Sequence, residues 1–205
     1  MKRKKLIIFD LDGVLVEACE WHRIALNEAL REVCDYEISK KDHEETFNGI
    51  PTRVKLKILS EKNIIKSECC ESVYRLKQEK TVSIIEKNAN QRIEKMQLID
   101  RLKSDGFIVA CFTNSIRKTA EMMLKKTGVL DKLDMLVTNQ DVKKPKPSPE
   151  GYNKIVDYYK IDKENVYIVE DSPKGVESAK KSLCKVIVVK NSYEVDYNSI
   201  KEKMI

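Results

Sequence analysis

Five short runs of apolar residues lie along the chain, and each has the length of a buried strand. They cover residues 6–9, 107–112, 135–138, 166–169 and 185–189, and most are rich in β-branched residues. Between the later runs, apolar residues recur at helical spacing at 116–126, 149–159 and 174–181. Strands that alternate with helices in this way predict a parallel sheet with helices on both faces, which is the doubly wound, Rossmann-like α/β class.

The stretch between the first two predicted strands is far longer than a single crossover requires. The first strand ends near residue 12 and the second begins near residue 107, whereas a strand–helix–strand connection needs roughly 30 residues. Helical patterns fill this stretch at residues 21–34, at 54–59, and from 68 to 102 with a break around 88–90. The pattern therefore predicts an α/β core domain formed by 1–15 and 93–205, interrupted by an α-helical domain at 16–92.

Composition narrows the classes of protein that this chain can represent. Charged residues make up 35% and apolar residues 41% of its 205 residues, which suits a globular chain with much helical surface. The six cysteines contain no C-x-x-C pair, so we expect reduced thiols in the cytoplasm rather than a disulfide framework or a zinc site. No segment approaches the uninterrupted apolar length of a membrane span. The formal net charge of +6 fits a lysine-rich solvated surface, a phosphorylated partner or a nucleic-acid partner.

Polar residues follow four of the predicted strands, at the edge where ligands bind in an open parallel sheet. Asp10 and Asp12 follow the first strand, with Gly13 to turn the chain. The other strands are followed by Thr113-Asn114-Ser115, by a Pro-rich loop that contains Lys146, and by Glu170-Asp171. Taken singly, these residues also suit helix caps, helix starts or solvated loops. Their occurrence in this order at one sheet edge favours a functional site.

This set of side chains has the chemistry that phosphoryl transfer requires. Two neighbouring carboxylates repel each other unless a cation or a shared proton lies between them, and acids from two strands offer the oxygen ligands that Mg²⁺ prefers. The cation would offset the charge of a phosphate dianion. Thr, Asn and Lys side chains can hold phosphate oxygens, while one Asp attacks phosphorus and another handles the proton of the leaving group.

At these positions the chain resembles the haloacid dehalogenase (HAD) superfamily, and the resemblance covers nearly the whole sequence. Asp10-Leu11-Asp12-Gly13-Val14 resembles motif I of that family, Thr113-Asn114 resembles motif II, Lys146 resembles motif III, and Glu170-Asp171-Ser172-Pro173-Lys174-Gly175-Val176 resembles motif IV. Lys144 also precedes a proline, but only a start at Lys146 fits every fixed position of the family pattern K-P-x-P-[DE]-x-[YF].

The resemblance implies a role for each motif residue. Asp10 would be the nucleophile that forms an aspartyl-phosphate, and Asp12 would be the general acid and then the base that activates water. Mg²⁺ would be bound by Asp10, by the backbone carbonyl of Asp12 and by Asp171, with Glu170 beside them or acting through water. Thr113, Asn114 and Lys146 would hold the phosphate.

The helical insertion lies between motifs I and II, where HAD subfamily I carries a helical cap; this subfamily includes β-phosphoglucomutase and many small-molecule phosphatases. Residues 48–53 resemble the substrate-specificity loop of such caps, which makes Arg53 a candidate substrate contact. His22 and Lys77 are further candidates, and each of the three also suits a solvated helix or a hinge. Val16-Glu17 departs from the family pattern, in which Asp and then Ser or Thr are common, so the hinge is not defined by the resemblance.

The expected function is Mg²⁺-dependent hydrolysis of a small phosphomonoester, such as a sugar phosphate or a nucleotide, by a monomer or weak homodimer. A phosphomutase of the β-phosphoglucomutase type would use the same residues. A phosphate-responsive binding protein would not need the proton donor Asp12. A polynucleotide-end phosphatase is less favoured, because aromatic residues form only 6% of the chain and its positive residues are scattered. We therefore expect a small phosphorylated metabolite as the partner, with neither a membrane nor a nucleic acid.

Overall fold

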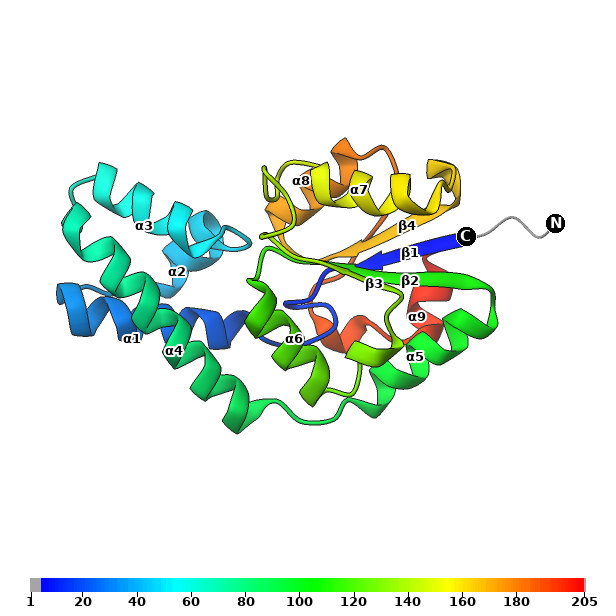
Figure 1. The fold of residues 1–205 in the computed structure, drawn as a ribbon, viewed down its shortest axis with the longest axis horizontal. Coiled ribbons are helices and arrows are strands. Elements are labelled where there is room, and N and C mark those ends of the chain that lie inside the picture. Colours follow the sequence, from blue (N-terminus) through cyan, green and yellow to red (C-terminus); the bar gives the residue numbers. More distant parts are fainter. Residues whose placement is uncertain (1–4, 205) are drawn as a thin grey trace. The chain divides into compact units, whose positions relative to one another are not determined.

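The computed structural model describes residues 5–204, which form two compact units (Figure 1). Among the described residues, one unit comprises 5–17 and 90–204, and the other comprises Ala18–Ala89. Residues 1–4 and 205, which the sequence assigns to the core domain, lie outside the described residues. Within the described part of the chain, no helix combines the length and the apolar character needed to cross a membrane.

A five-stranded parallel sheet organises the first unit. Its strands are β1 (Lys5–Phe9), β2 (Phe107–Phe112), β3 (Met135–Val137), β4 (Val166–Glu170) and β5 (Lys185–Val188), in the order β3-β2-β1-β4-β5. The central strand β1 is fully buried from Leu6 to Phe9, as expected of a parallel sheet that is covered on both faces. The five predicted strands and the α/β fold class are confirmed.

Helices cover both faces of this sheet (Figure 1). They are α5 (Ile93–Ser104), α6 (Arg117–Lys126), α7 (Glu150–Tyr159), α8 (Pro173–Lys181) and α9 (Tyr197–Glu202), with 3₁₀ turns η3 (Leu130–Lys132), η4 (Lys163–Asn165) and η5 (Ser192–Glu194). On the face covered by α7 and α8, Tyr152 and Ile155 pack with Leu6 and Ile8. The opposite face carries α5, α6 and α9. The helices predicted between the strands are confirmed, whereas α9 is absent from the prediction because only Ile200 of its six residues is buried.

The register of the sheet brings the ends of β1 and β4 side by side. Phe9 pairs with Val169, and the backbone N–H of Asp10 donates to the carbonyl oxygen of Val169 at 3.0 Å. The residue that follows β1 therefore lies next to Glu170, the last residue of β4. Main-chain hydrogen bonds thus bring the acids of motifs I and IV to one place.

The second unit is a helical module with its own apolar core. It contains α1 (Cys19–Cys34), α2 (Lys40–Asp42), the π-helical turn η1 (His43–Phe47), α3 (Thr52–Glu61), the 3₁₀ turn η2 (Ser67–Cys69) and α4 (Cys70–Asn88). Leu26 and Leu30 of α1 pack with Leu56 of α3 and Val73 of α4. The backbone of 18–89 is described throughout and contains no strand, so the predicted helical insertion is confirmed.

His43 in η1 is a buried histidine whose protonation is expected to weaken the fold in acid. Burial, together with the positive charges of Lys55 and Arg23, lowers the pKa of its imidazole to about 4. A histidine in the unfolded chain titrates near its ordinary pKa of about 6.5, so the unfolded state takes up the proton first as the pH falls. The free energy of unfolding should therefore decrease between about pH 6.5 and pH 4, by roughly 2–3 kcal/mol.

His43→Gln should lack this part of the acid destabilisation, because glutamine does not titrate. Urea unfolding of both proteins at about pH 7.5 and about pH 4.5 measures the difference. Carboxylates titrate equally in the two proteins, so the comparison isolates His43. An equal loss of stability in the variant and the wild type would contradict the prediction.

Candidate active site

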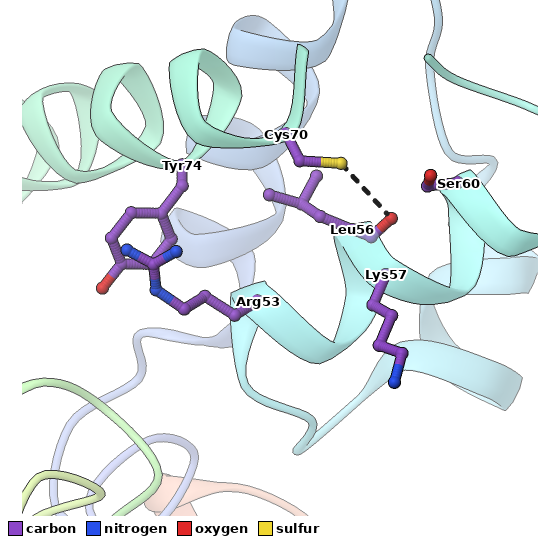
Figure 2. A pocket seen from close by; sticks show the side chains of 6 residues that line it. All are labelled: Arg53, Leu56, Lys57, Ser60, Cys70 and Tyr74. Atoms are coloured by element: carbon purple, nitrogen blue, oxygen red, sulfur yellow. Dashed lines mark hydrogen bonds between the residues drawn. The ribbon is translucent and has the colours of Figure 1, made fainter. Parts of the chain in front are cut away.

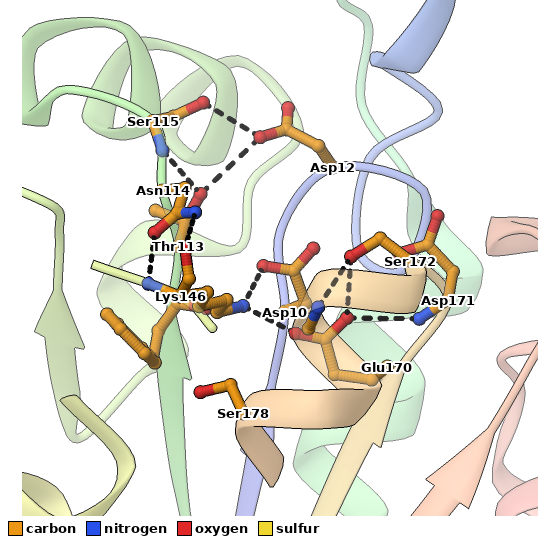
Figure 3. A network of polar contacts seen from close by, with 12 residues as sticks. Asp10, Asp12, Thr113, Asn114, Ser115, Lys146, Glu170, Asp171, Ser172 and Ser178 are labelled. Carbon is orange, nitrogen blue, oxygen red and sulfur yellow. Dashed lines mark hydrogen bonds and ion pairs between the residues drawn. The ribbon is translucent and has the colours of Figure 1, made fainter. Parts of the chain in front are cut away.

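Asp10 lies directly after β1, and its carboxylate is almost completely buried. Its Oδ1 accepts a hydrogen bond from Lys146 Nζ at 2.6 Å (Figure 3). Burial raises the pKa of Asp10 well above its usual value; the charge of Lys146 opposes this shift, while Glu170 and Asp171 add to it. The sequence prediction that Asp10 meets the acids of motif IV therefore agrees with its position.

Lys146 is the cation at the centre of this network. It reaches the end of the sheet from the loop before α7, and its Nζ donates to Asp10 Oδ1 and Glu170 Oε1, each at 2.6 Å, and to the carbonyl oxygen of Phe112 at 2.8 Å. These contacts use the three donors of an ammonium group. Burial by itself would lower the pKa of Lys146, but the two carboxylates outweigh it and raise that pKa. Lys146 therefore remains a cation held between two acids.

Glu170 is fully buried, and both of its carboxylate oxygens accept hydrogen bonds. Oε1 accepts from Lys146 and from the hydroxyl of Tyr152, each at 2.6 Å. Oε2 accepts from the backbone N–H of Asp171 at 3.2 Å and from Ser172 Oγ at 3.4 Å (Figure 3). These contacts fix the orientation of the Glu170 carboxylate. Tyr152 is a member of the site that the sequence prediction does not include, because its place in motif III and on the apolar face of α7 indicates only a core aromatic.

The close approach of Gly175 to Glu170 yields a second prediction. A Cβ atom at Gly175 would lie 2.0 Å from Glu170 Oε2, so Gly175→Ala must displace that carboxylate from Lys146 and Tyr152. We expect the free energy of unfolding to fall by about 3 kcal/mol, and turnover to fall with it. Urea unfolding and phosphate release measure the two effects. The control is Lys180→Ala on the exposed face of the same helix, and wild-type stability in Gly175→Ala would contradict this account of the packing.

Asp12 lies on a tight loop, and its carboxylate contacts a different set of side chains. The N–H of Gly13, which has a φ of 84°, donates to the carbonyl oxygen of Val16 at 2.7 Å and closes the loop. Asp12 Oδ2 accepts from Ser115 Oγ at 2.8 Å and from Thr113 Oγ1 at 3.4 Å (Figure 3). The sequence analysis places Ser115 at this edge with Thr113-Asn114 but assigns it no role, since its position also suits a helix cap.

Asn114 links motif II to motif III through the backbone. Its Oδ1 accepts from the N–H of Lys146 at 3.0 Å, and its Nδ2 donates to the carbonyl oxygen of Lys146 at 3.3 Å. Thr113 Oγ1 accepts from the N–H of Ser115 at 2.9 Å, which orders the turn after β2. Both residues thus lie at the predicted sheet edge, and Asn114 also holds the loop that carries Lys146.

The acids at this edge form an arrangement that suits a hard cation. Asp10, Glu170 and Asp171 each offer a carboxylate oxygen, and these atoms lie within 4.8 Å of one another. Burial and the charge of Glu170 raise the pKa of Asp171 to about 7. Such clustered, desolvated carboxylates repel one another, and a divalent cation with a preference for oxygen ligands would relieve that repulsion. The residues present therefore fit a Mg²⁺ ion.

Arg53 and Tyr74 border a pocket of about 220 Å³ in the helical unit (Figure 2). The guanidinium of Arg53 lies 3.8 Å from the centre of the Tyr74 ring and donates to both carboxylate oxygens of Glu71, at 2.7 and 3.3 Å. The side chain of Arg53 is still 61% exposed. The structure therefore places this predicted substrate contact in an ion pair on α3 and α4.

The other two candidates of the helical unit lie together. Lys77 Nζ and His22 Nδ1 are 3.1 Å apart, which joins α4 to α1. Lys77 is 6% exposed, so its ammonium group lies among neighbouring side chains rather than in solvent. This contact connects two residues that the sequence prediction treats separately.

Known proteins resemble this chain along most of its length. The pyrophosphatase PpaX of Bacillus velezensis is 28% identical over 214 residues, which cover 96% of this chain and 92% of that protein. A phosphorylated carbohydrates phosphatase of Thermotoga maritima is 28% identical over 179 residues, which cover 85% of this chain and 79% of that protein. The crystal structure of a β-phosphoglucomutase from Clostridium difficile shares the fold, with a TM-score of 0.83 and 22% identity over 98% of this chain and 97% of that chain.

The family assignment rests on a match to most of the sequence. The model of the haloacid dehalogenase-like hydrolases matches residues 7–189, a range that includes all four motifs and the helical insertion. The chain therefore belongs to the haloacid dehalogenase-like hydrolase family, as a phosphatase-like enzyme of the subfamily with a helical cap.

Proposed function

We propose that this protein is a Mg²⁺-dependent phosphatase that hydrolyses a small phosphomonoester through an aspartyl-phosphate on Asp10. The observation that carries the proposal is the meeting of Asp10, Glu170 and Asp171 within 4.8 Å at the carboxyl edge of the sheet, with Lys146 between two of them. A sugar phosphate or a nucleotide is the proposed substrate, and the name of the relative from Thermotoga maritima, a phosphorylated carbohydrates phosphatase, supports a sugar phosphate.

The proposed reaction has two steps. An oxygen of Asp10 forms a bond to phosphorus while the ester oxygen of the substrate leaves, and Asp12 donates the proton that this oxygen needs. Asp12 then accepts a proton from water, which attacks phosphorus and releases inorganic phosphate from Asp10. The contacts of Asp12 with Ser115 and Thr113 support this role, since they orient a second carboxylate outside the network of Lys146.

The remaining motif residues have supporting roles in this proposal. Asp10, Asp171 and the backbone carbonyl of Asp12 are the proposed ligands of Mg²⁺, with Glu170 beside them or acting through water. When bound, the ion would offset the negative charge of the phosphoryl group. Thr113, Asn114 and Lys146 are the proposed phosphate contacts, and Lys146 additionally favours the ionised form of Asp10.

The helical unit, which the sequence analysis assigns to 16–92, is the proposed cap that selects the substrate. Arg53, His22 and Lys77 are its proposed contacts, and their positive or hydrogen-bonding side chains suit a phosphorylated metabolite. The six cysteines form no disulfide in the structure, which supports the cytoplasm as the proposed location.

A phosphate-release screen over a broad panel of metabolites, with Mg²⁺ and with EDTA, tests the function. We expect release of inorganic phosphate from a subset of phosphomonoesters, and loss of that release in EDTA with recovery on addition of Mg²⁺. Conversion of one sugar phosphate into an isomer without free phosphate would replace the phosphatase by a phosphomutase. Undiminished release in EDTA would contradict the role of the metal.

A further inference from the structure

The chain passes between its two units at Glu17–Ala18, here called the outgoing linker, and again at Ala89–Asn90, the returning linker. Glu17 is one of the residues at which the sequence departs from the family pattern, and the structure gives it a defined contact. Its Oε2 accepts from the backbone N–H of Ser192 at 3.1 Å and from Ser192 Oγ at 2.9 Å. Ser192 is fully buried at the start of η5. The outgoing linker is thus attached to the C-terminal part of the first unit.

The start of α5, which directly follows the returning linker, reaches the same residue. Lys95, in the first turn of α5, is 1% exposed, and its Nζ donates to the carbonyl oxygen of Ser192 and to that of Val195, the latter at 2.5 Å. The guanidinium of Arg92, just before α5, lies 5.7 Å from the centre of the Tyr193 ring. Residues 192–195 therefore contact both linkers, although they lie about a hundred positions or more away in the sequence.

Burial of the Lys95 ammonium group costs desolvation free energy, so its hydrogen bonds to the segment 192–195 must offset that cost. Burial lowers the pKa of Lys95 to about 8; Arg92 adds to this effect, while Glu94, Asp196 and Glu17 oppose it. Desolvation of a cation in the protein interior is unfavourable, and an apolar side chain of similar volume at the same position often gives a more stable fold. A lysine that bonds two carbonyl oxygens of one short segment fixes that segment specifically.

The anchor of Glu17 also extends to the loop of Asp12. Val16, the neighbour of Glu17, forms a parallel bridge with Asp12, and its carbonyl oxygen accepts from Gly13. A displacement of Glu17 therefore moves the residue that closes the loop of the proposed general acid.

We propose that Ser192 is a shared anchor for both linkers of the helical unit, and that Glu17 and Lys95 are positioning residues that act through it. Through this anchor both linkers are held at the same residue of the first unit, so a change at one is transmitted to the other and to the loop of Asp12. The kinetic consequence rests on the proposed phosphatase function, whereas the coupling between the linkers does not.

Hydrogen–deuterium exchange of the full chain tests the coupling without any substrate. The variants are Glu17→Gln, Ser192→Ala and Lys95→Met. The control is Glu194→Gln, whose carboxylate accepts from Lys190 N–H inside the same C-terminal segment and, among its contacts in the structure, meets neither linker. We expect Glu17→Gln to speed exchange about tenfold in residues 13–20 and also in 88–96, and the control to change neither. Faster exchange confined to 13–20 would overturn the shared anchor.

Turnover of p-nitrophenyl phosphate with Mg²⁺ gives the second readout. Glu17→Gln and Lys95→Met should each lower kcat about tenfold with little change in KM. The kcat of the double variant should equal that of the single variant with the lower kcat, because both residues act through Ser192. Multiplied effects in the double variant would overturn the proposal. Absence of turnover in the wild type would instead count against the phosphatase function, and the exchange experiment would still decide on the anchor.

Discussion

Asp10→Asn is expected to lower kcat for phosphate release by about 10⁴-fold or more, with the fold intact. An amide is not a nucleophile toward phosphorus, and loss of a nucleophile that acts with a positioned acid and base removes most of the rate enhancement. Asparagine also removes one of the charges that crowd Glu170 and Asp171. Steady-state phosphate release at saturating Mg²⁺ measures the effect, and urea unfolding shows whether the variant folds.

The matched control for this substitution is Asp131→Asn, the same change at an exposed aspartate in η3. It should leave kcat and stability unchanged. Turnover in Asp10→Asn that equals the wild type would refute the assignment of the nucleophile, whichever substrate is used.

Asp12→Asn is expected to lower kcat by about 10²- to 10⁴-fold and to leave a phosphoryl group on Asp10. With p-nitrophenyl phosphate the leaving group needs no proton, so the first step continues while the second lacks its base. The phosphorylated chain should therefore accumulate after mixing and appear in intact-protein mass spectra. With an alkyl phosphate both steps need Asp12, so turnover should fall without accumulation.

Ser115→Ala tests the same role of Asp12 with a smaller expected effect. It keeps the Asp12 carboxylate but removes the hydrogen bond of 2.8 Å that orients it, so kcat should fall by about tenfold.

For Asp12→Asn itself, dephosphorylation of Asp10 at the wild-type rate would contradict the prediction, because it would show that another group activates water.

The hydrophobic pattern is sufficient to predict the sheet and most of the helices, because these elements bury long apolar runs. All four residues of 6–9 are fully buried in β1, and the break predicted around 88–90 falls between α4 and α5. The pattern fails at η1, α2 and α9, which are short and mostly polar. Asp196 does carry a capping signal for α9, since its side chain accepts from the N–H groups of Asn198 and Ser199, but a cap alone predicts no helix.

The motif residues of the site could be predicted to share one edge because parallel strands place their carboxyl ends together. The hydrogen-bond and ion-pair partners of these residues could not be predicted from the sequence. The ion pairs of Lys146 depend on how deeply the loop before α7 is buried, which no local pattern records. Tyr152 and Ser115 carry hydroxyls that look structural in sequence, and the bond of Arg53 to Glu71 joins residues 18 positions apart.

The main-chain hydrogen bond from Asp10 to Val169 makes the position of the Asp10 carboxylate depend on the pairing of β1 with β4. A slip of β1 by a single residue against β4 would exchange Asp10 for a neighbouring apolar side chain at the sheet edge and turn the carboxylate to the other face. Turnover then becomes a reporter of sheet integrity: any substitution in the buried centre that loosens this ladder should be detected first as lost activity, before unfolding is measurable.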